Sequence, residues 1–139
     1  GGCVIVQGSI STANLVKALP EIEKRGLNVK IVAAVSPQLF VRQDEAYRSS
    51  LLSPADRLDA MAVTNRARAT MTRWLGSEVG LEYTLSADWD NRWRTGGSVD
   101  EVIEEAHLSP KWILEGIRRF AKERPQRLKG TKDLLGRLE

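Results

Sequence analysis

The chain contains one cysteine and one histidine among its 139 residues, Cys3 and His107. A lone cysteine cannot form an internal disulfide, which argues against a disulfide-stapled secreted domain. A structural zinc site needs four nitrogen or sulfur ligands, more than these two side chains can supply. Cys3 heads an apolar run and is predicted to be buried. His107 follows a predicted helix, where a structural role is more common than catalysis.

Long hydrophobic runs and targeting segments are also absent from the sequence. No apolar stretch approaches the roughly 18 residues that cross a bilayer, and the N-terminus shows no signal-peptide pattern. We therefore expect a cytoplasmic protein without a membrane partner. The chain opens inside a predicted strand and lacks an initiator Met, so we expect a piece of a longer protein.

An excess of positive charge is absent except at the C-terminal end. Residues 1–117 carry 13 Lys and Arg against 15 Asp and Glu, whereas residues 118–139 carry 8 against 3. The net charge of +3 therefore belongs to the end of the chain, and the body is slightly acidic. Nucleic-acid-binding domains concentrate basic residues on one face. We expect no nucleic-acid partner, and we predict that residues 125–139 form a basic, flexible tail.

The sequence does contain apolar runs that alternate with segments of helical periodicity. The apolar runs 4–6, 29–35 and 58–64 predict buried strands, and the alternation over 81–86 predicts a half-buried fourth strand. The segments between them predict helices from Ser11 or Thr12 to Gly26, kinked at Pro20, and over 36–47, 67–75, 98–106 and 109–120. This order is typical of an α/β domain with a mainly parallel sheet, and we assign it to residues 1–124.

A ligand in such a fold binds outside the carboxyl ends of the strands. The residues predicted there, and proposed as a ligand crevice, are Gly8, Ser9, Ser36, Gln38 and Asn65. The turn over 7–12 has one glycine and matches no phosphate-binding motif, so a capped strand-to-helix turn is the favoured interpretation. In the Trp- and Arg-rich loop 88–97, the spacing fails as a calcium site. There we expect the Asp and Arg side chains to pair with each other or with backbone.

Several motifs, taken in order, resemble the C-terminal domain of transketolase. Residues 6–9 resemble the family's strand ending in Gly-Ser, and 27–36 its second strand. The most specific stretch is 38–52, which is similar to the family's Leu-Phe, Gln, Tyr and Ser-Val-Leu pattern. Trp74-Leu75-Gly76 and 109–120 resemble the Trp and Gly after the third strand and the closing helix. The loop 93–97 departs from the family pattern, and the family's antiparallel edge strand would precede Gly1.

The resemblance implies a three-layer α/β/α domain with four strands in the order 2-1-3-4. It implies a parent enzyme that moves a two-carbon ketol unit between sugar phosphates, using thiamine diphosphate and a divalent metal held between two upstream domains of different subunits. It assigns no catalytic, cofactor-binding or metal-binding residue to this chain, which alone should be inactive. The implied partners are those upstream domains, in a homodimer.

Two alternatives remain open at this point. One is the corresponding domain of a 2-oxoacid dehydrogenase β subunit, which also works with thiamine diphosphate. The other is a small-molecule-binding regulatory α/β module that uses the strand-end crevice.

Overall fold

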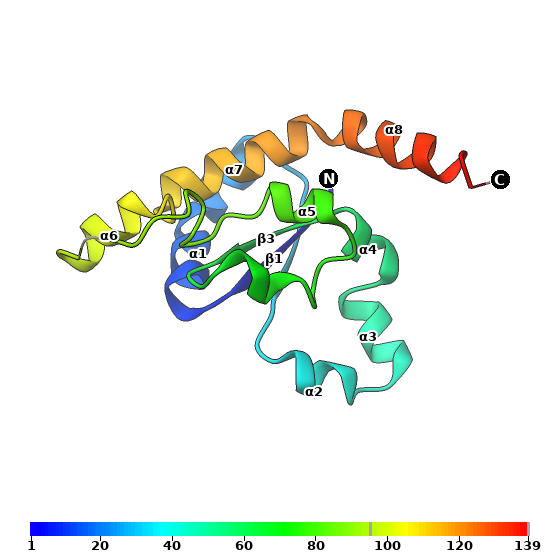
Figure 1. The fold of residues 1–139 in the computed structure, drawn as a ribbon, viewed down its shortest axis with the longest axis horizontal. Helices are drawn as coiled ribbons and strands as arrows, with labels where there is room; N and C mark the ends of the chain where they lie inside the picture. Colours follow the sequence, from blue (N-terminus) through cyan, green and yellow to red (C-terminus); the bar gives the residue numbers. More distant parts are fainter. Residues whose placement is uncertain (95, 139) are drawn as a thin grey trace.

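Three parallel strands form the centre of the computed structural model, which describes residues 1–94 and 96–138. Strands β1 (Cys3–Gln7), β2 (Lys30–Ala33) and β3 (Ala60–Thr64) are ordered β2-β1-β3 (Figure 1). In the register of the sheet, Ile5 lies beside Val32 on one side and Ala62 on the other. The central strand β1 is buried from Cys3 to Val6, as its continuous apolar run predicts.

Alternate residues of β1 and β3 belong to two hydrophobic cores, one on each face of the sheet, because successive side chains in a strand point to opposite faces. On one face, Val4, Val6, Met61 and Val63 pack against helices α1 (Ser9–Lys24) and α7 (Pro110–Lys122). The α7 residues in this core lie at the predicted i, i+4, i+7 positions: Ile113, Ile117 and Phe120.

The second face is covered by short elements. The chain passes from β2 through α2 (Pro37–Val41), α3 (Glu45–Leu51) and α4 (Pro54–Leu58) before it enters β3. A 3-10 turn η1 (Arg68–Met71) and α5 (Glu78–Glu82) follow β3. The core on this side contains Cys3, Ile5, Leu52, Ala62, Met71 and Trp74. The α/β class and the parallel sheet are therefore confirmed.

The predicted fourth strand over 81–86 is not formed as a strand. Ser77 caps α5 by accepting a hydrogen bond from Gly80 N, and this helix takes in Leu81 and Glu82. Leu85 forms an isolated parallel bridge with Val63, and the Thr84 hydroxyl accepts a hydrogen bond from Ala62 N of β3. The order of the sheet is thus 2-1-3, with a single residue in the fourth position.

Capping side chains also divide the predicted helix over 36–47. Ser36 caps α2 as expected, but Asp44 accepts a hydrogen bond from Tyr47 N and starts the separate helix α3. Ser53, predicted to lie in a loop, begins α4 with a full capping box to Asp56.

The helix predicted over 67–75 is only the 3-10 turn. Helix α1 starts at Ser9 with Gly8 as its N-cap, and it continues through Pro20 to Lys24.

The C-terminal part contains α6 (Val99–Glu105), α7 and α8 (Arg124–Leu135). The predicted capping box of Ser98 and Glu101 is confirmed at α6. The segment predicted as a tail is helical over α8, which buries no residue and extends beyond the sheet in Figure 1. In the described residues, no helix combines the length and apolarity needed to cross a membrane.

Candidate functional site

The carboxyl end of the sheet carries a cleft of about 590 Å³ beside the first strand-to-helix turn. Gly8 and Ser9 line it, together with Thr12, Val35 and Arg66. Gly8 has a φ of 101°, which favours glycine, and no side chain caps the first turn of α1 there. The free backbone N–H groups of that turn make this end of the cleft locally electropositive.

Asn65 lies against this turn without lining the cleft. A Cβ atom on Gly8 would come within 1.7 Å of Asn65 Oδ1, so only glycine allows the two to meet. The same Oδ1 accepts a hydrogen bond of 3.5 Å from the buried Ser11 hydroxyl. Asn65 therefore holds the turn in place.

Ser36 and Gln38 lie on the other side of the end of β2, where Ser36 is the N-cap of α2 and bonds to Gln38. Ser36 Oγ accepts a hydrogen bond from Leu39 N and donates one of 3.1 Å to Gln38 Oε1. Ser36 lines a second cleft, which shares Ala33 and Val35 with the first. The five residues predicted for one crevice are thus divided: Gly8 and Ser9 line one cleft, Ser36 the other, and Gln38 and Asn65 neither.

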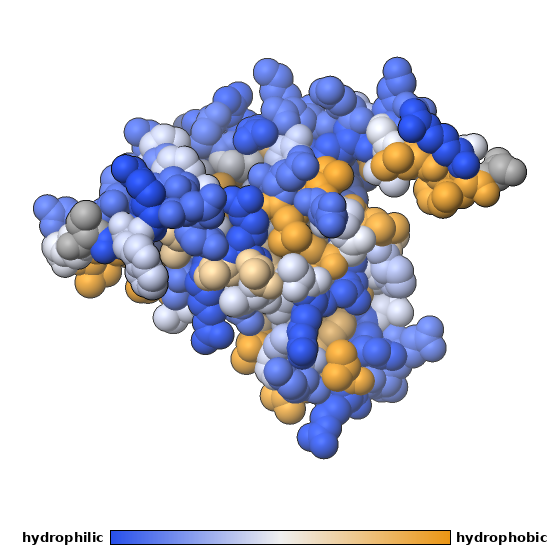
Figure 2. Space-filling model, in the orientation of Figure 1, coloured by the Kyte–Doolittle hydropathy of each residue, from blue (hydrophilic) through white to orange (hydrophobic). Residues whose placement is uncertain are grey.

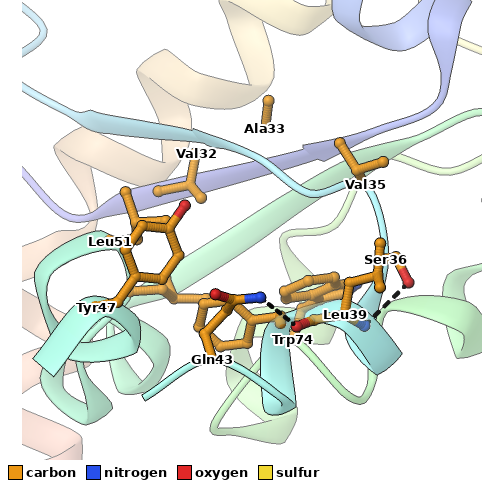
Figure 3. A pocket seen from close by; sticks show the side chains of 11 residues that line it. Val32, Ala33, Val35, Ser36, Leu39, Gln43, Tyr47, Leu51 and Trp74 are labelled. Carbon is orange, nitrogen blue, oxygen red and sulfur yellow. Dashed lines mark hydrogen bonds between the residues drawn. The ribbon is translucent and has the colours of Figure 1, made fainter. Parts of the chain in front are cut away.

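The second cleft is an apolar pocket of about 270 Å³ between β2 and the helices α2 and α3 (Figure 3). Val32 comes from β2, Leu39 from α2, and Tyr47 and Leu51 from α3. Trp74 lies against Phe40, with ring centroids 5.5 Å apart. Gln43 Nε2 donates to the carbonyl of Leu39 at 3.2 Å, whereas the buried Trp74 Nε1 has no hydrogen-bond partner among the described residues.

Hydrophobic side chains continue from this pocket onto the surface. We call the exposed set the α2–α3 face, and its exposed fractions are Val35 86%, Leu39 59%, Val41 62%, Tyr47 49% and Leu51 40%. In Figure 2, the hydrophobic residues in the region of α2 and α3 lie among hydrophilic ones. The sequence pattern predicts one helix over 36–47 and does not predict which of its apolar residues are exposed.

The Trp- and Arg-rich loop is held by ion pairs, as predicted. Arg94 contacts both Asp90, at 2.5 Å, and the carbonyl of Ala87, at 2.7 Å. The hydrogen bonds from Arg94 and Arg92 lower the pKa of Asp90 to about 2. Trp93 projects from this loop with 96% of its surface exposed.

Cys3 and His107 both have structural surroundings. Cys3 is buried, and desolvation raises the pKa of its thiol to about 12, which makes it a poor nucleophile. His107 follows Ala106, the C-cap of α6, and stacks between Trp89 and Trp112, with centroid distances of 4.1 and 3.9 Å. Within residues 1–94 and 96–138, no group of three or more His, Cys, Asp or Glu side chains is arranged to hold a metal ion.

Comparison with known proteins adds no family to this geometry. No protein-family model matches the chain, and no curated protein sequence matches it.

Proposed function

We propose that this chain is a non-catalytic assembly domain of a transketolase-type enzyme, corresponding to that family's C-terminal domain. The parent enzyme would transfer a two-carbon ketol unit between sugar phosphates. The chain's part would be to pack against the upstream domains that hold thiamine diphosphate and a divalent metal, and to support the homodimer. The proposal starts from the order of motifs between residues 6 and 120.

The observation that carries the proposal is the α2–α3 face. The stretch 38–52, which bears the most specific resemblance, forms α2 and α3, and neither helix buries a residue. Five large apolar side chains therefore face solvent in one region. Burying such side chains is worth about 25 cal/mol per Å² of apolar surface, and contiguous exposed patches of this kind mark contact surfaces. A surface for a neighbouring domain fits them better than a catalytic site does.

The experiment is an assembly test in the full-length parent. Replacing Leu39 by Asp places a charge on the α2–α3 face and should lower ketol transfer from a ketose phosphate to an aldose phosphate at least tenfold, with the homodimer weakened. The matched control is Val16→Asp, because Val16 is similarly exposed, at 54%, but lies on α1 outside the face. Equal activity of both variants would remove the support for an assembly role.

The cofactor gives a second test on the isolated chain. Calorimetric titration with thiamine diphosphate and Mg²⁺ should show no micromolar binding, since the resemblance places that site in other domains. Micromolar binding by this chain would contradict the proposed division of labour. Activity of the parent on sugar phosphates or on 2-oxoacids separates transketolase from the β subunit of a 2-oxoacid dehydrogenase.

A regulatory small-molecule site remains the second candidate, and one observation favours it. The first turn of α1 opens without a side-chain cap into the cleft that Gly8 and Ser9 line. Anions bind at such turns. A thermal-shift screen with sugar phosphates and nucleotides tests this candidate, and stabilisation lost in Ser9→Asp would support it.

A further inference from the structure

A third hollow lies away from the strand-end clefts, between the segment 82–89 and α7, and we call it the α7 groove. Its volume is about 410 Å³. Trp112, Glu115, Gly116 and Arg119 line one side, and their spacing places them on one face of α7. A Cβ on Gly116 would come within 2.8 Å of Leu85, so the glycine allows the helix and the segment to approach closely.

One end of the groove is a fixed aromatic wall made of Trp89, His107 and Trp112. The three rings are stacked, and both indole N–H groups are also held: Trp89 donates to the carbonyl of Glu105 at 3.3 Å, and Trp112 to Glu104 Oε1 at 2.7 Å. His107 has a φ of 57°, a conformation that costs a non-glycine residue about 1 kcal/mol or more. The stacking offsets that cost and keeps the wall rigid.

A buried hydroxyl lies in the lining of the same groove. Ser86 is 0% exposed, and its Oγ makes no hydrogen bond of ordinary geometry among the described residues. The nearby carboxylate is that of Asp88, whose pKa the serine hydroxyl helps to lower. Leaving a buried hydroxyl unpaired costs about 1–3 kcal/mol, so most buried hydroxyls in folded proteins have a partner. A ligand group that can donate to or accept from Ser86 would remove that penalty.

The charged groups of the lining cancel. Arg68 and Arg119 are balanced by Glu82 and Glu115, so the groove offers no net attraction to a phosphate or to a cation. Arg119 also pairs with Glu123 at 3.4 Å, and Glu115 with Arg118, which further reduces the pull on a charged ligand. Guanidinium groups donate hydrogen bonds and carboxylates accept them, so together they match hydroxyl groups, which do both.

We propose that the α7 groove binds a neutral polyhydroxylated ligand, a free sugar or a polyol. An apolar face of the ligand would lie against the aromatic wall, and its hydroxyl groups would bond to Ser86 Oγ and to the balanced Arg and Glu side chains. This site is separate from the α2–α3 face and does not depend on the proposed transketolase role.

The test uses the four indole N–H signals of the chain in a ¹H–¹⁵N correlation spectrum. Trp89 and Trp112 line the groove, whereas Trp74 lies in the second core and Trp93 in the exposed loop. Titration with D-ribose, D-fructose or glycerol to about 100 mM should shift Trp89 and Trp112 saturably, with a Kd of about 1–10 mM. No saturable shift with any of the three, or equal shifts of all four indoles, would overturn the proposal.

Two further arms test the neutrality of the ligand. Ribose 5-phosphate should bind no more tightly than ribose, because the charges of the lining cancel, and glycine should not compete. Tenfold tighter binding of the phosphate, or competition by glycine, would show an anion site or a zwitterion site and would overturn the assignment to neutral ligands.

Ser86→Ala tests the buried hydroxyl. The substitution removes only the contact of this hydroxyl with the Asp88 carboxylate, so the fold should be kept, as thermal unfolding can verify. Sugar binding should weaken about tenfold, the equivalent of one hydrogen bond of about 1.4 kcal/mol. Trp93→Phe is the control and should bind as the unchanged chain does. An unchanged Kd in Ser86→Ala, with the fold intact, would exclude the serine from the site.

Discussion

The body of the molecule and the segment 37–58 use similar residues to opposite effect. In the body, made of β1, β3, α1 and α7, large apolar side chains such as Ile5, Leu15 and Phe120 are at most 1% exposed. Between residues 37 and 58, Leu52 alone is buried. Leu39, Val41 and Tyr47 are about half exposed or more.

Element length explains this difference. Helices α1 and α7 have 16 and 13 residues, long enough to present a continuous stripe to the sheet. Helices α2, α3 and α4 have 5, 7 and 5 residues, and short helices depend on caps and on contacts to persist. The segment 37–58 is therefore held by polar caps and a few anchors, and its apolar side chains are left available to a neighbour.

The largest expected effect tests the contrast in burial directly. Phe120→Ala should lower the free energy of unfolding by about 3–5 kcal/mol, because it leaves a cavity in a core where Phe120 packs edge-on against Tyr83 with ring centroids 5.6 Å apart. Leu39→Ala, on the α2–α3 face, should cost no more than about 0.5 kcal/mol. Urea denaturation of both variants measures the two costs.

A comparable loss in both variants would mean that Leu39 is covered in solution. Sedimentation of the chain would then show whether a second copy covers it, because burial in a dimer makes the stability depend on protein concentration.

The contrast also shows which parts of the fold could be predicted from the sequence. The runs at β1 and β3 predicted strands within about two residues, since each is apolar on both faces and ends at polar or turn residues. The i, i+4, i+7 pattern placed Ile113, Ile117 and Phe120 in the core. These signals are strong because a single pattern decides the structure.

Prediction failed where two local signals compete. Residues 81–86 alternate like a strand, but the Ser77 cap and the close approach of Gly80 to the carbonyl of Ala60 favour helix α5. Of the residues predicted for the crevice, Gly8 and Ser9 do line a cleft, because they follow directly from the end of β1. Ser36 lines a different cleft, because the path of the chain after β2 depends on packing with Trp74, about 40 residues away.

The second-largest expected effect is a loss of stability of the body at alkaline pH. Burial raises the pKa of Cys3 from an ordinary value of 9.0 to about 12, so the folded chain retains a proton that the unfolded chain loses. Stability is therefore complete below pH 9 and falls as the pH rises toward 12. At pH 10 the loss should be about 1 kcal/mol, measured as the difference in pH dependence between the unchanged chain and Cys3→Ala. Identical pH profiles of the two would show that the thiol ionises freely in the folded chain.

The smallest expected effect is a loss of stability of the segment 37–58 at acidic pH. Asp56 completes the capping box of α4 and accepts a hydrogen bond of 2.8 Å from Lys30 Nζ on β2. The Lys30 ammonium is the main cause that lowers the pKa of Asp56 below 3.8. A lowered pKa stabilises the folded state above the unfolded pKa, near pH 4, and this stabilisation is lost as the pH falls through the folded value. Because both side chains reach solvent, the contribution should not exceed about 0.5 kcal/mol.

Local hydrogen exchange detects this loss better than global unfolding does, because α4 buries no residue and can open without the cores. The amides of α4 should lose protection as the pH falls below about 4, after correction for the intrinsic exchange rates, while those of β1 keep theirs. In Asp56→Asn, the amide oxygen can still cap α4 but carries no charge, so protection should be lower at pH 6 and should no longer depend on acid. If α4 and β1 lose protection together, the segment and the body unfold as one unit, and the difference in burial between them has no counterpart in stability.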